Sequence, residues 1–363
     1  MKLLLAIRSL NIGGAERQFL ELVRGIRFPV VVVTMYHGEL EEEVLRLPHV
    51  HYFCLEKKGR YDVGFLMRYK KFLIDKKPDV IYSWMGEMNL LSLWCKPKDS
   101  KLVWGFRAAN MNLKEYGKFS ELIFLLQRRF SKNVDKIIFN SYASLEYHRR
   151  LGFAVDKATV IHNGIDTGRF ARIKELRKQF REKFDLDEND IAIGMVARLD
   201  PMKGYPVLAR AAKRILDEFE NVKFFAAGSG DEKILEECKN ILGSYNEKRF
   251  IWLGKTNTPE YVYNGLDIYV SSSFGEGFSN SIAEAMACEV PCVVTDVGDS
   301  KFIVGDTGVV VSPGDWRALY EGIKSMINLS YKKLGKKAKV RVEKMFSTKK
   351  MVDETVNQIL SLL

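Results

Sequence analysis

Residues 274–287 read FGEGFSNSIAEAMA and carry the strongest structural signal in the chain. The segment follows an apolar stretch that is predicted as a strand, is rich in small residues, and opens into a predicted helix. A glycine-rich turn of this kind lets backbone N–H groups approach a ligand, and the N-terminus of the helix favours negative charge. The segment therefore predicts a ligand-binding loop in an α/β domain.

Two glutamates lie in this segment, Glu276 in the loop and Glu284 two turns inside the predicted helix. Carboxylates accept paired hydrogen bonds from vicinal hydroxyl groups, so the two side chains could hold a sugar and a ribose. A capping residue and a solvated helix face would explain the same pair equally well. The residues alone leave both interpretations open.

Further strands and helices alternate on both sides of this loop. The predicted strands are 3–7, 30–34, 80–83, 102–106, 136–140, 191–196, 222–227, 250–253, 268–271 and 293–295. The predicted helices include 64–75, 119–129, 207–219, 233–242 and 281–286. Short apolar strands separated by helices indicate parallel sheets buried on both faces. A chain of 363 residues accommodates two such domains, and the join is predicted between Asn163-Gly164 and a charged linker at 169–190.

A second signal is MVARLDPMKG at residues 195–204. Arg198 lies just after the predicted strand 191–196, and Lys203 lies five residues further on, across a turn. Both could reach a diphosphate, the arginine through two hydrogen bonds and the lysine as a point charge. Cations fixed beside a departing diphosphate stabilise the transition state more than the ground state. The alternative is a surface ion pair between Arg198 and Asp200.

The charge of the chain is unevenly distributed. The formal net charge is +11, and residues 1–170 hold 28 Lys/Arg against 18 Asp/Glu, a net charge of +10. The first half is therefore expected to meet an anionic partner: a phosphorylated acceptor, a membrane surface or nucleic acid. A basic surface without a partner is the alternative.

Composition predicts a globular protein of the cytoplasm. Hydrophobic residues make up 47% of the chain and charged residues 28%. The five cysteines form no CxxC pair and no zinc-like cluster with histidine, so reduced, buried thiols are expected. Residues 1–8 read MKLLLAIR, too short an apolar run for a signal peptide, and no stretch approaches the ~18 apolar residues of a membrane span.

Taken together, the ordered motifs resemble the retaining nucleotide-sugar glycosyltransferases of family four, which have the GT-B fold. The motifs are GGAER at 13–17, IHNGID at 161–166, Arg198 with Lys203, GSG at 228–230, and Glu276 with Glu284. The resemblance covers nearly the whole chain and implies two doubly wound Rossmann-like domains facing across a deep cleft. An acceptor-binding domain would comprise residues 1–168 and a returning C-terminal helix at 345–363, and a donor-binding domain would comprise residues 169–344.

The resemblance also implies roles for single residues. Glu276, Arg198 and Lys203 would be catalytic, with Glu276 at the transferred sugar, and Glu284 would bind the ribose. The donor-binding residues would be Gly14, Arg198, Lys203, Ser229, Gly277, Phe278, Ser279, Asn280 and Glu284. No metal or other cofactor is expected, because Arg198 and Lys203 supply the positive charge.

One position departs from the family pattern. Many members have a histidine after the strand predicted at 102–106, where this chain has Arg107; Asn110 is a second residue expected on the acceptor side. Arginine keeps its proton and cannot act as a general base, but it could hold an acceptor phosphate or the departing diphosphate. In the family mechanism a donor phosphate oxygen takes the proton of the attacking hydroxyl, so no protein nucleophile is required.

The acceptor is expected to be a lipid-diphosphate-linked or saccharide intermediate of bacterial surface polysaccharide or lipopolysaccharide synthesis, with a UDP-sugar as donor. Residues 119–132 read FSELIFLLQRRFSK, an apolar segment with a basic end, and resemble segments of relatives that dock on the inner face of the cytoplasmic membrane. A core-packed helix is the alternative for this segment.

Other functions remain as alternatives. A GDP-mannose-dependent mannosyltransferase would share the fold and motifs. A nucleic-acid-binding protein would suit the basic half, although no known binding module is found and no nucleic-acid partner is expected. A dinucleotide-binding oxidoreductase lacks its G-x-G-x-x-G fingerprint after the first strand. An inactive member of the family is disfavoured by the retained Arg198, Lys203, Glu276 and Glu284.

Overall fold

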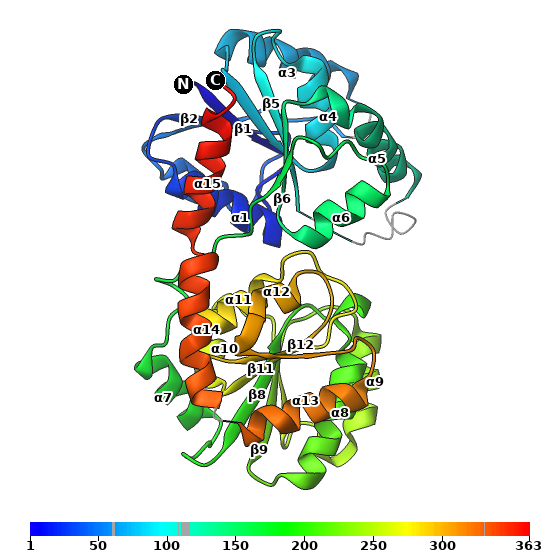
Figure 1. Ribbon diagram of the computed structural model, residues 1–363, viewed down its shortest axis with the longest axis vertical. Coiled ribbons are helices and arrows are strands. Elements are labelled where there is room, and N and C mark those ends of the chain that lie inside the picture. Colours follow the sequence, from blue (N-terminus) through cyan, green and yellow to red (C-terminus); the bar gives the residue numbers. More distant parts are fainter. Residues whose placement is uncertain (60–61, 108, 110–116, 330) are drawn as a thin grey trace. The chain divides into compact units, whose positions relative to one another are not determined.

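A computed structural model describes residues 1–59, 62–107, 109, 117–329 and 331–363 (Figure 1). The chain forms two compact units: unit 1 comprises Met1–Gly164 and Thr348–Leu363, and unit 2 comprises Ile165–Ser347. The boundaries predicted from the sequence fall at 168/169 and 344/345. Each unit is an α/β structure with its own sheet.

Parallel strands form the sheet of unit 1 in the order β3-β2-β1-β4-β5-β6-β7. They are β1 (Leu3–Ile7), β2 (Val30–Thr34), β3 (Val50–Cys54), β4 (Val80–Trp84), β5 (Lys101–Phe106), β6 (Lys136–Phe139) and β7 (Ala158–Val160). Because β1 pairs with both β2 and β4, the chain progresses outward from β1 in both directions. This is a doubly wound order, with its topological switch point between β1 and β4.

Helices cover both faces of this sheet. They are α1 (Gly14–Gly25), α2 (Glu41–Leu45), α3 (Val63–Lys76), α4 (Gly86–Cys95), α5 (Lys118–Phe130), α6 (Tyr142–Arg150) and α15 (Thr348–Leu360). In β1, Leu3, Leu5 and Ile7 pack in the cluster that contains α1 and α15, whereas Leu4 and Ala6 pack with α3, α4 and α5. Burial on both faces explains why β1 is a continuous apolar run.

The last helix of the chain, α15, belongs to unit 1. Its residues Met351, Val352 and Ile359 are buried in the same cluster as Leu20 and Val23 of α1. Figure 1 shows α15, in red, beside α1, in blue, and the two helices are in contact. Unit 1 is therefore assembled from two segments that lie far apart in the sequence.

Unit 2 has a parallel sheet in the order β10-β9-β8-β11-β12-β13. Its strands are β8 (Ile191–Val196), β9 (Val222–Ala227), β10 (Phe250–Gly254), β11 (Ile268–Ser271), β12 (Cys292–Thr295) and β13 (Val309–Val311). Its helices are α7 (Lys174–Lys183), α8 (Tyr205–Glu218), α9 (Glu232–Leu242), α10 (Pro259–Gly265), α11 (Asn280–Ala287), α12 (Ser300–Val304), α13 (Trp316–Asn328) and α14 (Tyr331–Met345). Here the switch point lies between β8 and β11.

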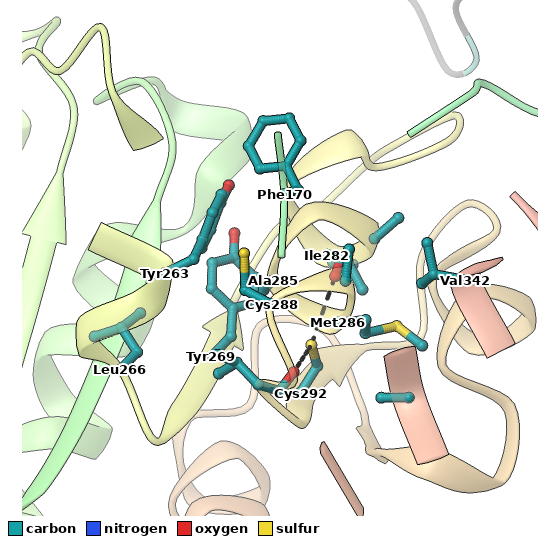
Figure 2. Close-up of a cluster of buried hydrophobic side chains, with 14 of the residues drawn as sticks. Phe170, Tyr263, Leu266, Tyr269, Ile282, Ala285, Met286, Cys288, Cys292 and Val342 are labelled. Carbon is teal, nitrogen blue, oxygen red and sulfur yellow. Dashed lines mark hydrogen bonds between the residues drawn. The ribbon is translucent and has the colours of Figure 1, made fainter. Parts of the chain in front are cut away.

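The two faces of this sheet are covered by different helices. One cluster joins Ile193 and Met195 of β8 to α8, α9 and α13. The opposite cluster contains residues of α7, α10, α11 and α14, and Figure 2 shows Tyr263, Tyr269 and Met286 among its side chains. Among the described residues, no helix is long and apolar enough to cross a membrane.

The charged stretch at 169–190, predicted as a linker, contains a helix of unit 2 instead. Phe180 of α7 is fully buried, and Arg177 and Arg181 reach the buried carboxylate of Asp267 at 2.7 and 3.1 Å. The linker prediction was wrong because Phe180 and two arginines with a distant partner anchor this helix, while most of its other side chains are charged.

Candidate functional site

The main candidate residues of unit 2 gather where β8 and β11 end. β8 continues into the loop that carries Arg198 and Lys203, and β11 continues into the loop that carries Glu276. The two strands are parallel neighbours, so both loops leave the same edge of the sheet, at the switch point. In doubly wound sheets this is the edge at which ligands bind.

Lys203 and Glu276 are held together at the centre of this edge. The ammonium group of Lys203 lies 2.5 Å from Oε1 of Glu276, and the hydroxyl of Ser273 donates to the same oxygen at 2.8 Å. The side chains are only 22% and 12% exposed, respectively. Within the described part of the chain, Oε2 of Glu276 receives no hydrogen bond. Glu276 is therefore fixed through one oxygen and retains acceptor capacity at the other.

The loop that carries Lys203 is fixed by close backbone packing. The carboxylate of Asp200 accepts a hydrogen bond from the N–H of Met202 at 2.9 Å, and the hydroxyl of Ser272 donates to the carbonyl of Lys203 at 2.9 Å. Gly204 has φ +65°, and a Cβ atom there would lie 2.1 Å from the carbonyl oxygen of Ser272. Only glycine fits this turn without strain, so the position of Lys203 depends on it.

The glycine-rich loop leads directly into α11. The carbonyl of Gly277 accepts a hydrogen bond from the N–H of Asp299 at 3.0 Å, and the ring of Phe278 packs edge-on against Phe346 with centroids 5.3 Å apart. Ser279 occupies the N-cap position of α11, and its backbone is extended. The loop is thus anchored on both sides, with the N-terminus of α11 at its end.

Glu284 lies at the start of the second turn of α11, which begins at Asn280, and therefore not two turns inside the helix as predicted. One carboxylate oxygen of Glu284 accepts a hydrogen bond from the hydroxyl of Tyr263 at 2.9 Å. Tyr263 is fully buried, and Figure 2 shows it beside Tyr269 in the core. Burial, and then the neighbouring Glu284, raise the pKa of Tyr263 well above its usual value, so its hydroxyl remains a donor.

Arg198 and Ser229 are placed differently. The side chain of Arg198 is 80% exposed and lies 3.6 Å from Asp200, the ion pair named as the alternative, and no contact joins it to Lys203 or Glu276 among the described residues. Ser229 is exposed, and its carbonyl accepts a hydrogen bond from the N–H of Leu199 at 3.1 Å. A Cβ atom on Gly228 would lie 1.7 Å from a carbonyl oxygen of the loop after β8, so the GSG segment runs against that loop.

Two predicted residues of unit 1 are described. Gly14 is the exposed first residue of α1, and Arg107 is half-buried at the end of β5. Asn110 lies outside the described residues. In the part of the chain that the structure describes, no group of three or more His, Cys, Asp or Glu side chains could hold a metal ion.

Sequence reasoning missed Ser273 and Tyr263, which hold the two glutamates. Ser273 lies three residues before Glu276, in a run of three serines that offered a weak local signal. Tyr263 is separated from Glu284 by 21 residues and lies on another helix, so no spacing rule connects them. Only the three-dimensional fold brings this pair together.

Family models match most of the chain. Residues 12–169 match the model described as Glycosyltransferase Family 4, and residues 190–328 match the model described as Glycosyl transferases group 1. The chain is a family 4 glycosyltransferase. The predicted family is confirmed, and this decides against the oxidoreductase and the nucleic-acid-binding protein as the class of the molecule.

Two relatives of this glycosyltransferase carry names that state a sugar-transfer activity. The capsular polysaccharide biosynthesis glycosyltransferase CapM of Staphylococcus aureus is 30% identical over 206 residues. This match covers 55% of this chain and 54% of CapM, so the similarity spans about half of each protein. A Campylobacter jejuni enzyme, N-acetylgalactosamine-N,N'-diacetylbacillosaminyl-diphospho-undecaprenol 4-alpha-N-acetylgalactosaminyltransferase, is 25% identical, and the match covers 99% of each chain.

A solved structure shares the whole fold. HepE of Anabaena, crystallised with UDP, superposes with a TM-score of 0.84 at 20% identity, and the match covers 100% of both chains. HepE has also been solved with UDP-glucose, with a TM-score of 0.83. The predicted α/β, GT-B fold class is confirmed. As a family 4 glycosyltransferase the protein is an enzyme that acts on nucleotide sugars.

Proposed function

We propose that unit 2 binds a UDP-sugar, and that the enzyme transfers the sugar with retention of configuration to a lipid-diphosphate-linked saccharide in bacterial surface polysaccharide synthesis. The complexes of HepE with UDP and UDP-glucose support UDP as the nucleotide. The names of CapM and of the Campylobacter enzyme, which include a capsular polysaccharide and a diphospho-undecaprenol saccharide, support the acceptor class.

The observation that carries this proposal is the Lys203–Glu276 pair at the switch point of unit 2. The 2.5 Å contact between them holds a cation and a carboxylate in a semi-buried position beside the glycine-rich loop. In the proposal, Oε2 of Glu276 accepts hydrogen bonds from hydroxyl groups of the sugar. Lys203 faces the diphosphate, with the backbone of residues 277–280 alongside it. A preorganised cation in such a place stabilises the charge that develops on the leaving group.

The ribose is assigned to Glu284. Because Tyr263 occupies one carboxylate oxygen of Glu284, that side chain is oriented before the nucleotide binds, which reduces the entropy lost on binding. Vicinal hydroxyl groups of a ribose can then donate to the carboxylate as a pair.

The proposed transfer requires no protein nucleophile. The acceptor hydroxyl attacks the anomeric carbon from the face that the diphosphate leaves, the bond from that carbon to the diphosphate oxygen breaks, and the new glycosidic bond forms. The proton of the hydroxyl passes to a phosphate oxygen of the departing UDP. In the proposal, Lys203 and the exposed Arg198 neutralise the negative charge of the departing UDP. Because this role needs no metal ion, activity should survive treatment with EDTA.

Thermal unfolding with a panel of UDP-, GDP-, ADP- and TDP-sugars tests the donor site. A ligand at 100 times its Kd adds ~2.7 kcal/mol to the free energy of unfolding, an easily measured shift. We expect a shift with UDP-sugars that is lost in Glu284→Ala and retained in Glu321→Ala, a control on the exposed surface of α13. A shift with GDP-mannose alone would favour the mannosyltransferase, and no shift with any nucleotide sugar would overturn the proposal.

Turnover distinguishes catalysis from binding. Replacing Lys203 with Gln removes the cation while keeping an amide at the same position, and kcat should fall by a factor of about 30 to 1,000 if Lys203 faces the departing diphosphate. An unchanged kcat with saturating donor would assign Lys203 to the support of Glu276 alone.

The acceptor side of the proposal includes contact with an anionic membrane through α5. Phe124 anchors this helix in the core, while Leu122 and Leu125 are 51% and 47% exposed and Arg128 and Arg129 lie in its last turn. An apolar face flanked by arginines suits an interface with anionic lipid. A larger fraction of the enzyme should sediment with vesicles of phosphatidylglycerol than with vesicles of phosphatidylcholine.

A charge on that face tests the contact. Leu122→Glu should abolish the lipid-dependent sedimentation, whereas Leu329→Glu, at a leucine of unit 2 with similar exposure, should preserve it. Equal sedimentation of both variants would reject α5 as the contact.

A further inference from the structure

Arg107 has an unusual environment at the end of β5 in unit 1. Its guanidinium group lies over the indole ring of Trp84, 3.5 Å from the ring centroid, and donates hydrogen bonds to the hydroxyl of Tyr82 at 2.9 Å and to Oδ1 of Asn163 at 3.3 Å. Three neighbours thus hold the group in one orientation, at the carboxyl edge of the sheet, the edge where doubly wound domains bind ligands.

Within the described ranges of the chain, the positive charge of Arg107 has no counter-charge. Among the residues that the structure describes, no carboxylate lies within ion-pair distance of the guanidinium, and its Nε atom is buried without an acceptor. Burial lowers the pKa of Arg107, which reflects the cost of desolvating the cation. Even partial burial of a charge that is neither paired nor fully hydrogen-bonded destabilises the folded state.

A purely structural role explains this arrangement poorly. A guanidinium has five N–H donors, and only two of those of Arg107 donate to residues in the described part of the chain. A side chain without a buried, unpaired Nε–H group could make the same indole contact and the same two hydrogen bonds. An arginine that is held in place without a neighbouring carboxylate is expected where a ligand supplies the anion. A local feature that lowers the stability of the fold and is nevertheless retained is characteristic of functional sites.

We propose that Arg107 is the receptor for an oxyanion of the substrate that unit 1 binds, either the carboxylate of an acidic sugar or a phosphate. Both anions offer oxygens that match the fork of donors on a guanidinium, and lysine would not reproduce that geometry. The inference rests on the proposed function in one respect, namely that unit 1 binds a substrate.

Thermal unfolding of the wild type and of Arg107→Gln, with and without probes, tests the proposal. Without a probe, Arg107→Gln should unfold at the same temperature as the wild type or higher, because the substitution removes an uncompensated charge. With D-glucuronate or inorganic pyrophosphate as the probe, the wild type should gain stability and Arg107→Gln should not. Glucose, the neutral control, should shift neither protein.

Repeating the measurement with saturating UDP keeps the anions out of the donor site of unit 2, so the additional shift reports on Arg107 alone. A shift with glucuronate only assigns an acidic sugar, and one with pyrophosphate only assigns a phosphate. Arg107→Lys, which keeps the charge without the fork, should show a reduced shift with the same anion.

Two results would overturn the inference. One is a lower unfolding temperature of Arg107→Gln together with an unchanged response to anions, which is the behaviour of a structural brace. The other is a wild type that responds to neither anion. A failure of UDP to stabilise any of these proteins would instead contradict the proposed function, because that response does not depend on Arg107.

Discussion

Acidification should destabilise unit 1 through His148, a residue of α6 that lies in the core. Its ring centroid is 4.5 Å from that of Phe106, 5.0 Å from that of Phe139 and 4.8 Å from that of Phe153. Nδ1 donates to the carbonyl of Ser144 at 2.8 Å, and no carboxylate contacts the ring among the described residues. Burial in this apolar environment lowers the pKa of His148 to about 4.

The size of the effect follows from linkage. In the unfolded chain a histidine has a pKa of about 6.5, so above that pH neither state is charged and the free energy of unfolding is unaffected. Below it, the unfolded chain takes up a proton that the folded chain does not, and stability falls. The loss is about 2 kcal/mol at pH 5, and it approaches about 3 kcal/mol near pH 4, where folded His148 also becomes protonated.

Urea unfolding of the wild type and of His148→Leu, at about pH 8 and about pH 5, measures this loss. Because α6 belongs to unit 1, hydrogen exchange of its peptides identifies which urea-induced unfolding transition is that of unit 1. The wild type should lose about 2 kcal/mol more than the variant between the two pH values. Glu41 raises the pKa of the exposed His37, an effect of opposite sign, but His37 is present in both proteins and cancels in the difference.

Equal pH dependence in the two proteins would refute the placement of an unprotonated His148 in the core. NMR offers an independent check, because the Hε1 resonance that disappears in His148→Leu is that of His148. Its chemical shift should stay constant down to about pH 5, and titration near pH 6.5 would contradict the reasoning.

Three further substitutions probe unit 2. Tyr263→Phe removes the hydroxyl that donates to Glu284 and should weaken UDP binding, measured by calorimetry, by about tenfold, with a smaller change in kcat; an unchanged Kd would detach Tyr263 from the nucleotide site. Gly204→Ala should cost about 2 kcal/mol or more in urea, and clearly more than Gly254→Ala, which has φ +69° but open space around it. Asp267→Asn leaves two arginines without their carboxylate and should cost about 3 kcal/mol; a Tm like that of the wild type would show that the arginines find other partners.

The central strands of both sheets could be predicted from the sequence, because burial on both faces makes them continuous apolar runs. β1, β2, β8, β9 and β11 were predicted with the bounds that the structure has. Three strands were missed: β3, β7 and β13. All three lie at an edge of a sheet and are only partly buried, so their sequences show neither a long apolar run nor a clean alternation.

The candidate site was predictable where its residues lie close together in the sequence. The loop with Glu276 and the turn with Lys203 each carry their own glycine pattern, and the adjacency of β8 and β11 then brings the two side chains within 2.5 Å. Contacts between side chains of elements that lie far apart in the sequence leave no such pattern in it. The hydrogen bond from Tyr263 to Glu284 and the stacking of Arg107 on Trp84 depend on helix and strand packing that no local spacing encodes.

The return of α15 to unit 1 imposes an order on folding during synthesis. Every element of unit 2 has left the ribosome once Ser347 has emerged, so this unit can fold as a continuous nascent segment. The strands of unit 1 emerge before unit 2, yet Met351 and Val352, which cover part of the core of unit 1, are translated after unit 2. At typical translation rates unit 1 therefore waits about ten seconds or more with an apolar surface open to chaperones and proteases. A defect in α15 would accordingly damage a unit whose strands the ribosome makes before those of unit 2.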